Sequence, residues 1–367
     1  MARVKFHLPE ELVMEILYWL PVLSLLQFKS VCKLWKSIIT DPTFIKTHSY
    51  RSQIMANEKA SLLLLTNCQF SRRHRSSPDF NYYLVEPNGC IVIGLCDGII
   101  CLTDDKFFHL FNPATKQGKR LPIFPKSTEK AMRGAYPSVT QAFGFDAISG
   151  DYKILKFICP TVPTNVVPVV QLYSTKPGTW KEIYVHDASV SEVLRYLHLQ
   201  LGPTVLIKGA LYMGHRRQLL SFDVHSEMFS VVEFPSSMLR YSAVLDFEGS
   251  VAVISKSVGE GSGISLWTLD DTRGEVSWTK KFVVRNDLGW VHSYLGGGLL
   301  YARMPWARDR SGRNSVTIVH ACTKKKAKLP VRKLSAVLKY RETLVSIEGF
   351  KPARKMFPWF NPGFKQV

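Results

Sequence analysis

The strongest constraint on the fold of this 367-residue chain is a plan of short apolar strands that recurs five times between residues 94 and 330. Each unit has an apolar strand after a glycine, a second apolar strand, and a turn leading into a strand with a central aromatic residue. Glycines mark the units at spacings of 52, 59, 40 and 49 residues, at Gly98, Gly150, Gly209, Gly249 and Gly298. Such a period is typical of the three- or four-stranded blades of a β-propeller.

Two further apolar runs, Leu62 to Leu65 and Leu344 to Ile347, lie one at each end of the β region. Pairing these runs would close a ring and remove both exposed sheet edges. The sequence therefore predicts an all-β domain over residues 60–348, in the form of a β-propeller of about six blades. A β-sandwich is the main alternative.

Residues 8–48 follow a different pattern, because their apolar side chains recur at helical spacings of three and four residues. We expect a small all-α module of three short helices. The first begins at Pro9, the second follows a capping box of Ser24 and Gln27, and the third begins at Asp41-Pro42. About forty residues cannot bury this much apolar surface among themselves, so another chain should cover part of it.

The helical segment also carries a specific motif pattern. Its parts are Leu8-Pro9, Glu10-Glu11, Ile16-Leu17, Leu20-Pro21, Leu25, Phe28, Val31-Cys32-Lys33 with Trp35, and Asp41-Pro42 with Phe44. This pattern resembles an F-box along its full length. In that family the module docks on the Skp-type adaptor of a cullin-RING ubiquitin ligase. An ordinary helical cap packed on the rest of the chain is the alternative.

The resemblance implies a set of adaptor-binding residues, most of them apolar. They are Leu8, Pro9, Leu12, Ile16, Leu17, Leu20, Pro21, Leu25, Phe28, Val31, Cys32 and Trp35.

The β region contains motifs of a second family. The matching residues are Gly94, Cys96, Gly98, Cys101 and Leu102; Asn112 to Thr115; Gly144 to Asp146; Lys208 to Tyr212; Ser221 to Asp223 with Glu227 and Phe229; and Leu266-Trp267 with Ser277 to Thr279. They resemble the F-box-associated, kelch-like propeller of plant-type F-box proteins, which include the S-locus F-box group. The resemblance covers nearly all of residues 60–348. Met213 stands where the family usually has tryptophan.

The net charge of +19 is concentrated at the C-terminal end of the sequence. Residues 301–367 contain 16 Lys and Arg against 3 Asp and Glu, which is +13, and the other 300 residues contribute +6. Such a concentration attracts nucleic acid, anionic lipid or an acidic protein, and charge alone does not choose among them. The candidates for contact with an acidic target are Lys324, Lys325, Lys326 and Lys328; a solvated turn is the alternative.

No motif points to catalysis, a cofactor or a metal. The ten histidines are scattered, and Cys90, Cys96 and Cys101 lack the closely spaced pair that zinc sites favour, so we expect buried strand thiols there. The apolar runs are far shorter than the roughly 18 residues of a membrane span, and no transmembrane helix is expected. Seven irregularly spaced cysteines without a secretion signal predict an intracellular protein, in the nucleus, the cytoplasm or both.

The sequence as a whole predicts a non-catalytic substrate receptor of an SCF-type ubiquitin ligase. The expected domains are the F-box (1–48), a linker (49–59), the propeller (60–348) and a basic aromatic tail (349–367). The F-box would bind the Skp-type adaptor, and through it the cullin and RING subunits, while the propeller binds an unknown target protein. The alternative is a basic protein that binds nucleic acid or a membrane surface and has an accessory F-box; its binding would weaken steeply with salt. Nucleic acid is not the expected partner.

Overall fold

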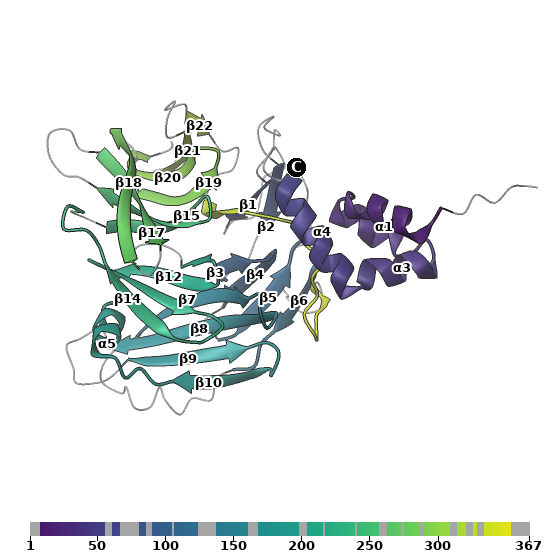
Figure 1. Cartoon of the computed structure of the whole chain (residues 1–367), viewed down its shortest axis with the longest axis horizontal. Helices are drawn as coiled ribbons and strands as arrows, with labels where there is room; N and C mark the ends of the chain where they lie inside the picture. Colours follow the sequence, from purple (N-terminus) through teal and green to yellow (C-terminus); the bar gives the residue numbers. More distant parts are fainter. Residues whose placement is uncertain are drawn as a thin grey trace, which may run out of the picture.

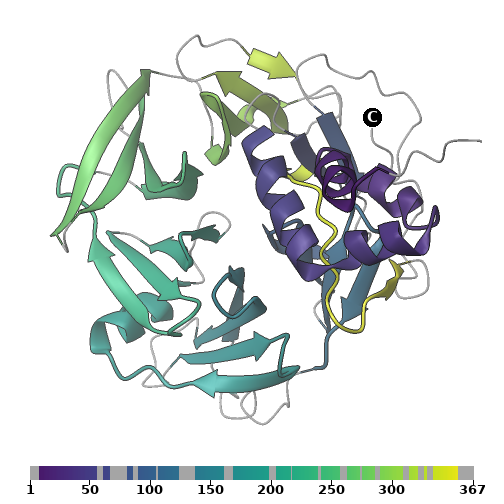
Figure 2. The ribbon, with the colours of Figure 1, turned by 45° about the vertical axis from the view of Figure 1, so that its right-hand side comes forward.

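The computed structural model shows helices followed by a ring of β-sheets, as in a propeller (Figure 1, Figure 2). It describes residues 8–55, 61–66, 81–85, 90–104, 106–123, 137–160, 168–197, 204–215, 217–238, 241–256, 263–272, 275–285, 290–308, 314–320, 326–328 and 334–353. The helices stand at one end of the ring, and α1 to α3 point away from it.

The helical module consists of α1 (Glu10–Tyr18), α2 (Val22–Phe28), α3 (Lys33–Thr40) and α4 (Pro42–Met55). Four helices replace the three that were expected, because the predicted second helix is interrupted after Phe28. Ser24 lies inside α2 and forms no capping box; Pro21 is the N-cap of that helix. Cys32 has extended backbone and caps α3, where its Sγ accepts a hydrogen bond from the Trp35 amide.

The start and end of α4 were predicted with different success. Asp41 caps this helix as expected, since its Oδ1 accepts from the amides of Thr43 and Phe44 at 2.8 and 3.0 Å. The helix then continues to Met55, so the first seven residues of the expected linker 49–59 are helical. The domain boundaries themselves stay a prediction.

Five complete blades follow. The first contains β3 (Ile91–Cys96), β4 (Ile99–Thr103), β5 (Phe108–Asn112) and β6 (Gln117–Arg120), with the short β24 (Lys351–Pro352) added at its outer edge. The second contains β7 (Pro137–Asp146), β8 (Asp151–Pro160), β9 (Val169–Ser174) and β10 (Thr179–Ile183). The third contains β11 (Val205–Ile207), β12 (Ala210–His215), β13 (Gln218–Asp223) and β14 (Phe229–Glu233).

The fourth blade contains β15 (Tyr241–Phe247), β16 (Ser250–Lys256), β17 (Gly263–Thr272) and β18 (Glu275–Arg285), and the fifth contains β19 (Trp290–Gly296), β20 (Leu299–Arg308), β21 (Asn314–His320) and β22 (Lys326–Lys328). A three-stranded closing sheet has the order β2-β1-β23, from β1 (Ser61–Thr66), β2 (Asn81–Val85) and β23 (Leu334–Lys339). It is not a complete antiparallel blade, because β1 and β2 run parallel. Over the residues that the structure describes, the domain therefore has five blades and a closing sheet rather than about six blades.

The strand that closes the ring is not the one we expected. The run from Leu62 pairs with β23, where Leu64 lies opposite Val337, and not with residues 344–347. Leu62 and Val337 are both buried by this pairing. Residues 344–347 pack elsewhere, against the helical module and the first blade. Several short apolar runs compete for one edge, and their periodicity alone does not choose the partner.

The five glycines that mark the repeat occupy one structural position. Each lies in the turn between the first and second strands of its blade and has a positive φ, from 66° at Gly150 to 82° at Gly209. At Gly98 the preceding residue, Asp97, also has a positive φ of 44°. A two-residue hairpin turn with two positive φ angles favours glycine, so the sequence period reports the turns directly.

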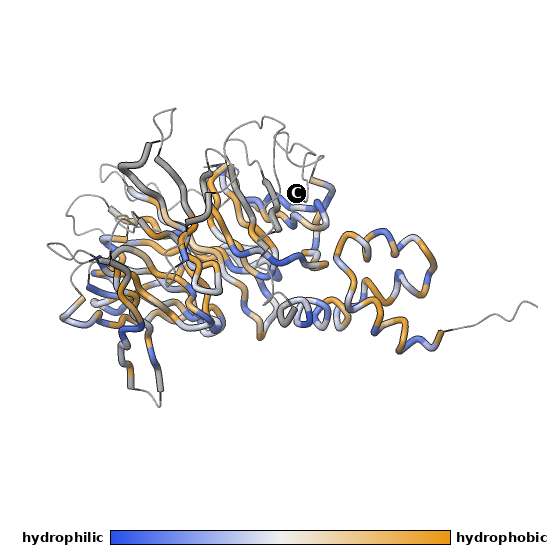
Figure 3. Tube along the Cα trace, turned by 90° about the horizontal axis from the view of Figure 1, so that it is seen from above, coloured by the Kyte–Doolittle hydropathy of each residue, from blue (hydrophilic) through white to orange (hydrophobic). Residues whose placement is uncertain are grey.

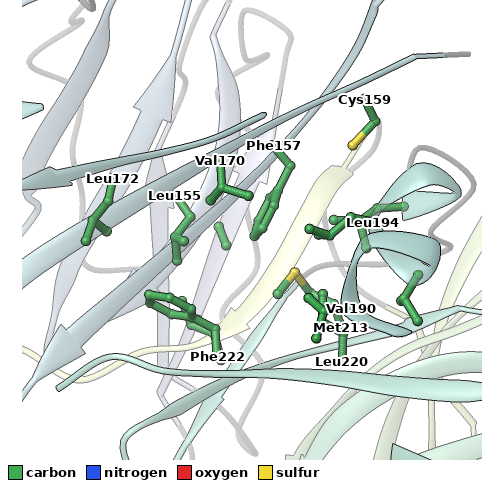
Figure 4. Close-up of a cluster of buried hydrophobic side chains, with 14 of the residues drawn as sticks. Leu155, Phe157, Cys159, Val170, Leu172, Val190, Leu194, Met213, Leu220 and Phe222 are labelled. Atoms are coloured by element: carbon green, nitrogen blue, oxygen red, sulfur yellow. The ribbon is translucent and has the colours of Figure 1, made fainter. Parts of the chain in front are cut away.

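The aromatic residue at the centre of the fourth strand joins a blade to its neighbour. Trp180 of β10 donates from Nε1 to the Pro122 carbonyl at 2.9 Å, and Trp278 of β18 donates to the Glu233 carbonyl at the same distance. Between the second and third blades, α5 (Ala188–Arg195) completes a large apolar core (Figure 4). Met213, which stands where the family usually has tryptophan, is fully buried in that core.

Candidate functional site

The first helix, α1, and its C-cap residue Trp19 expose an apolar stripe. Leu12, Ile16 and Trp19 are 52%, 53% and 56% exposed. They share one face because side chains four and seven residues apart lie above one another on a helix. Val13 and Leu17 lie on a different face and are buried in the core of the helical module. The apolar content of α1 thus exceeds what its own module can cover.

The rest of the module adds to this exposed apolar surface. Leu8 before α1, Leu23 in α2, Val31 before α3 and Leu34 in α3 are all exposed. Nearly half of the exposed large apolar side chains among the described residues therefore come from the first 50 positions. Figure 3 shows that hydrophobic residues recur along the projecting helices. Large exposed apolar surfaces of this kind mark sites of protein association.

The structure divides the twelve expected adaptor-binding residues into three groups. Seven are exposed (Leu8, Pro9, Leu12, Ile16, Pro21, Val31, Cys32), three are half-buried (Leu20, Phe28, Trp35) and two are buried (Leu17, Leu25). Leu17 of α1 and Leu25 of α2 both belong to the buried core of the module. These two offer no surface to a partner, and the adaptor contact of the other ten stays a prediction.

Three exposed residues were missed from the sequence: Trp19, Leu23 and Leu34. For Trp19 a usable signal existed, since it follows Leu12 by seven residues and Ile16 by three. We overlooked this signal because Trp19 lies between Ile16-Leu17 and Leu20-Pro21, at a position that the motif does not define. Leu23 and Leu34 became recognisable only once α2 and α3 were known to be separate helices.

An ion pair attaches the stripe to α4. Arg51 pairs with Glu15, and its guanidinium carbon lies 4.6 Å from the centre of the Tyr18 ring and 5.5 Å from that of Trp19. Trp19 also donates from Nε1 to Glu15 at 3.1 Å. The hydrogen bonds from Arg51 and Trp19 lower the pKa of Glu15, so its carboxylate remains ionised beside the stripe. These contacts orient Trp19 on the exposed face.

The folded state of the helical module should weaken in mild acid because of His48. This residue is buried against Phe44, and its Nε2 donates to the Leu20 carbonyl at 2.9 Å. Burial lowers the pKa of His48, although the hydrogen bond acts in the opposite direction. The unfolded chain then binds the proton more tightly, so stability is lost as the pH falls below about 6.5.

We expect amide hydrogens of α4 to exchange faster at pH 5.5 than at neutral pH, once the pH dependence of the intrinsic exchange rate has been corrected for. His48→Gln should reduce this excess, because the glutamine side chain does not titrate. His186→Gln, at an exposed position of the propeller, is the matched control and should change nothing. Equal pH dependence in the native chain and in His48→Gln would contradict the role given to His48.

The candidate basic cluster lies partly outside the described residues. Lys324 and Lys325 lie outside the described residues, as do residues 354–367 of the expected tail. Lys326 and Lys328 belong to β22, the outermost strand of the fifth blade, opposite Val319 and Thr317. Residues 349–353 of the expected tail lie on the first blade, where Lys351 pairs with Gly118.

The cysteines of the first blade are buried, as expected. Burial, with a smaller effect of Asp104, raises the pKa of Cys90 to about 11, and burial raises those of Cys96 and Cys101 as well. Within the described residues, no three His, Cys, Asp or Glu side chains gather closely enough to hold a metal ion. No helix in the same residues has the length and hydropathy to cross a membrane.

Comparisons with known proteins agree with this architecture. Residues 51–294 match the family described as F-box associated beta propeller domain, and residues 6–47 match the F-box domain. Three similar proteins come from Arabidopsis thaliana. Putative F-box protein At4g09190 is 27% identical over 75% of this chain and 70% of its own length, F-box protein At4g19940 is 26% identical over 77% and 73%, and Putative F-box protein At4g38870 is 28% identical over 75% and 67%.

These matches do not test the relation to the S-locus group, which stays a prediction. The propeller family covers more than half of the chain, and the F-box family covers its N-terminal helices. The chain therefore belongs to the plant-type F-box proteins that carry an F-box associated beta propeller domain.

Proposed function

We propose that this chain is the substrate receptor of an SCF-type ubiquitin ligase. Its F-box binds a Skp-type adaptor, which connects it to the cullin and RING subunits, and its propeller binds a target protein. The observation that carries the proposal is the exposed stripe of Leu12, Ile16 and Trp19 on a module that projects from the propeller. Covering such a stripe stabilises a complex by about 25 cal/mol for each Å² of apolar surface removed from water.

The mechanism is one of proximity rather than catalysis by this chain. Holding a target next to the ubiquitin-loaded subunit raises the effective concentration of its lysines, and the other subunits supply the chemistry. We also place the chain inside the cell, in the nucleus, the cytoplasm or both, where its free thiols stay reduced.

The end of the propeller opposite the F-box is our candidate for the target site. The turn containing Asp97 contacts α4 and therefore defines the F-box end of the blades. The other end exposes Ile91 and Val139, at the starts of the neighbouring inner strands β3 and β7, and Tyr184 after β10. All three side chains are exposed, so a protein target has access to them there.

Reconstitution tests this proposal directly. The full chain is expected to form a one-to-one complex with a Skp-type adaptor and to join a cullin-RING assembly through it. Cross-links to proteins captured by the full chain should fall on the propeller end that contains Tyr184. Failure to bind the adaptor would refute the proposal, and tight binding to nucleic acid that weakens steeply with salt would support the alternative function.

A further inference from the structure

Residues 341–353 form a segment, here called the strap, that lies between the F-box and the first blade. The strap leaves β23, runs beside the helices and ends as β24, paired with β6 (Figure 2). Its last described residue, Ala353, is buried and donates its amide to the Lys116 carbonyl at 2.9 Å. The strap is therefore not part of the closing sheet, and its end is bound to the first blade.

The strap contacts the F-box with one face and the propeller with the other. Leu344 is 3% exposed and belongs to the apolar core of the F-box, together with Ala114 from the β5–β6 turn. The next residue, Val345, packs on the core of the first blade, as does Ile347. Alternate residues of an extended segment point to opposite sides, which is how one strand serves two cores.

The strap also meets the start of α2. Glu342 accepts from the amide of Val22, the first residue of that helix, at 3.3 Å. Pro21, the N-cap of α2, has no side-chain capping bond, and no acidic residue lies in the first turn. A carboxylate from the strap therefore takes the position of a cap and complements the helix dipole.

Asn112 binds the strap in a way that its own turn does not require. Its Oδ1 accepts from the amides of Ala114 and Thr115, at 2.9 and 3.2 Å. Asp223 makes the same two bonds at the same turn of the third blade, so an acceptor is enough for the turn. The amide group of Asn112 adds two donated bonds, to the carbonyls of Thr343 at 3.0 Å and Val345 at 2.8 Å.

Gly98 leaves the space that the strap occupies. A Cβ at this position would lie 2.4 Å from Cγ2 of Thr343 and 2.7 Å from the carbonyl oxygen of Arg341. Gly209 sits in the same turn of the third blade with a similar positive φ, and a Cβ there would meet nothing within 4 Å. Both glycines suit the turn, but only Gly98 is also required by the strap. The Gly98 and Asn112 motifs of the first blade thus converge on one segment.

From these contacts we propose that the strap holds the F-box in one orientation on the propeller, with Asn112, Gly98 and Leu344 as positioning residues. Two domains of one chain move relative to each other unless a substantial interface joins them. The strap contributes to such an interface, because it packs on the F-box with one face and on the first blade with the other. The consequence for ubiquitin transfer rests on the proposed function: a fixed F-box sets which lysines the ligase reaches. The orientation itself does not depend on an adaptor or a target.

Single-molecule energy transfer between fluorophores at Ser37 of α3 and Ser237, which is exposed after β14 of the third blade, measures this orientation in the full chain. We expect one narrow distance distribution for the native chain. Asn112→Asp, which keeps the acceptor and removes both donors to the strap, should broaden it about twofold, and so should Gly98→Ala. The matched controls Asp223→Asn and Gly209→Ala change the equivalent turn of the third blade and should leave the width unchanged.

The outcomes separate this proposal from the proposed function. A broad distribution in the native chain, or an unchanged width in both Asn112→Asp and Gly98→Ala, would overturn the role of the strap. Adaptor affinity should stay within about twofold in these variants, because the exposed stripe on α1 is untouched. In a reconstituted ligase, self-ubiquitination should spread from a few lysines to many in the strap variants, and an identical pattern would also contradict the proposal.

Discussion

Replacing Leu12 and Ile16 together with aspartate is expected to lower the affinity for a Skp-type adaptor by a hundredfold or more. Side chains at the centre of an interface typically contribute about 2 kcal/mol or more each, and 1.4 kcal/mol is a factor of ten. Aspartate adds the cost of burying a charge. Since both residues are about half exposed in the free chain, the fold should tolerate the change. Titration calorimetry measures the affinity, and circular dichroism checks the helices.

A matched control exists on the propeller. Ile148, in the β7–β8 turn, is 77% exposed, and Ile148→Asp should leave adaptor affinity unchanged. Leu17→Asp gives the contrasting result, because it places a charge in the F-box core and should unfold the module. Native affinity in the Leu12 and Ile16 double variant would show that the α1 stripe is not the adaptor site.

Ending the chain after Lys333 is expected to unfold or aggregate the propeller. This cut removes β23, leaves β1 without its antiparallel partner and deletes the buried side chains of Val337 and Tyr340. Each buried apolar side chain contributes about 1.5–3 kcal/mol, so the loss approaches the roughly 5–15 kcal/mol by which a protein is stable. The exposed edge of β1 is also a template for association. Size-exclusion chromatography and thermal melting are the measurements.

Two longer chains serve as controls. A chain that ends at Ala353 keeps every described C-terminal contact and should melt like the full protein. A chain that ends at Tyr340 keeps the pairing of β1 with β23 but loses the strap and its buried Leu344, so it should melt below the full chain and above the chain ending at Lys333, while its F-box becomes mobile. If the chain ending at Lys333 were monomeric with the native melting temperature, ring closure by β23 would not be needed for folding.

The features that the sequence predicted well are those that depend on neighbours along the chain. A hairpin turn with positive φ angles favours glycine, so Gly98, Gly209 and their counterparts marked the blades correctly. The cap by Asp41 acts within three residues, and it too was predicted. The apolar spacing of α1 was recognised for the same reason, because helical phase is a local property.

The features that only the tertiary structure decided depend on a choice between chemically similar partners. Apolar runs at Leu344 and at Leu334 both suited the edge of β1, and the geometry of the closed ring selected the second. Leu17 and Leu12 have the same side chain, and only packing against α2 to α4 made one core and the other surface. The strap could not be foreseen, because Asn112 and Thr343 meet across 231 positions of sequence. The hydrophobic effect that buries such segments is non-directional. The sequence therefore determined that these apolar segments would be buried, and the assembled fold determined which partners bury them.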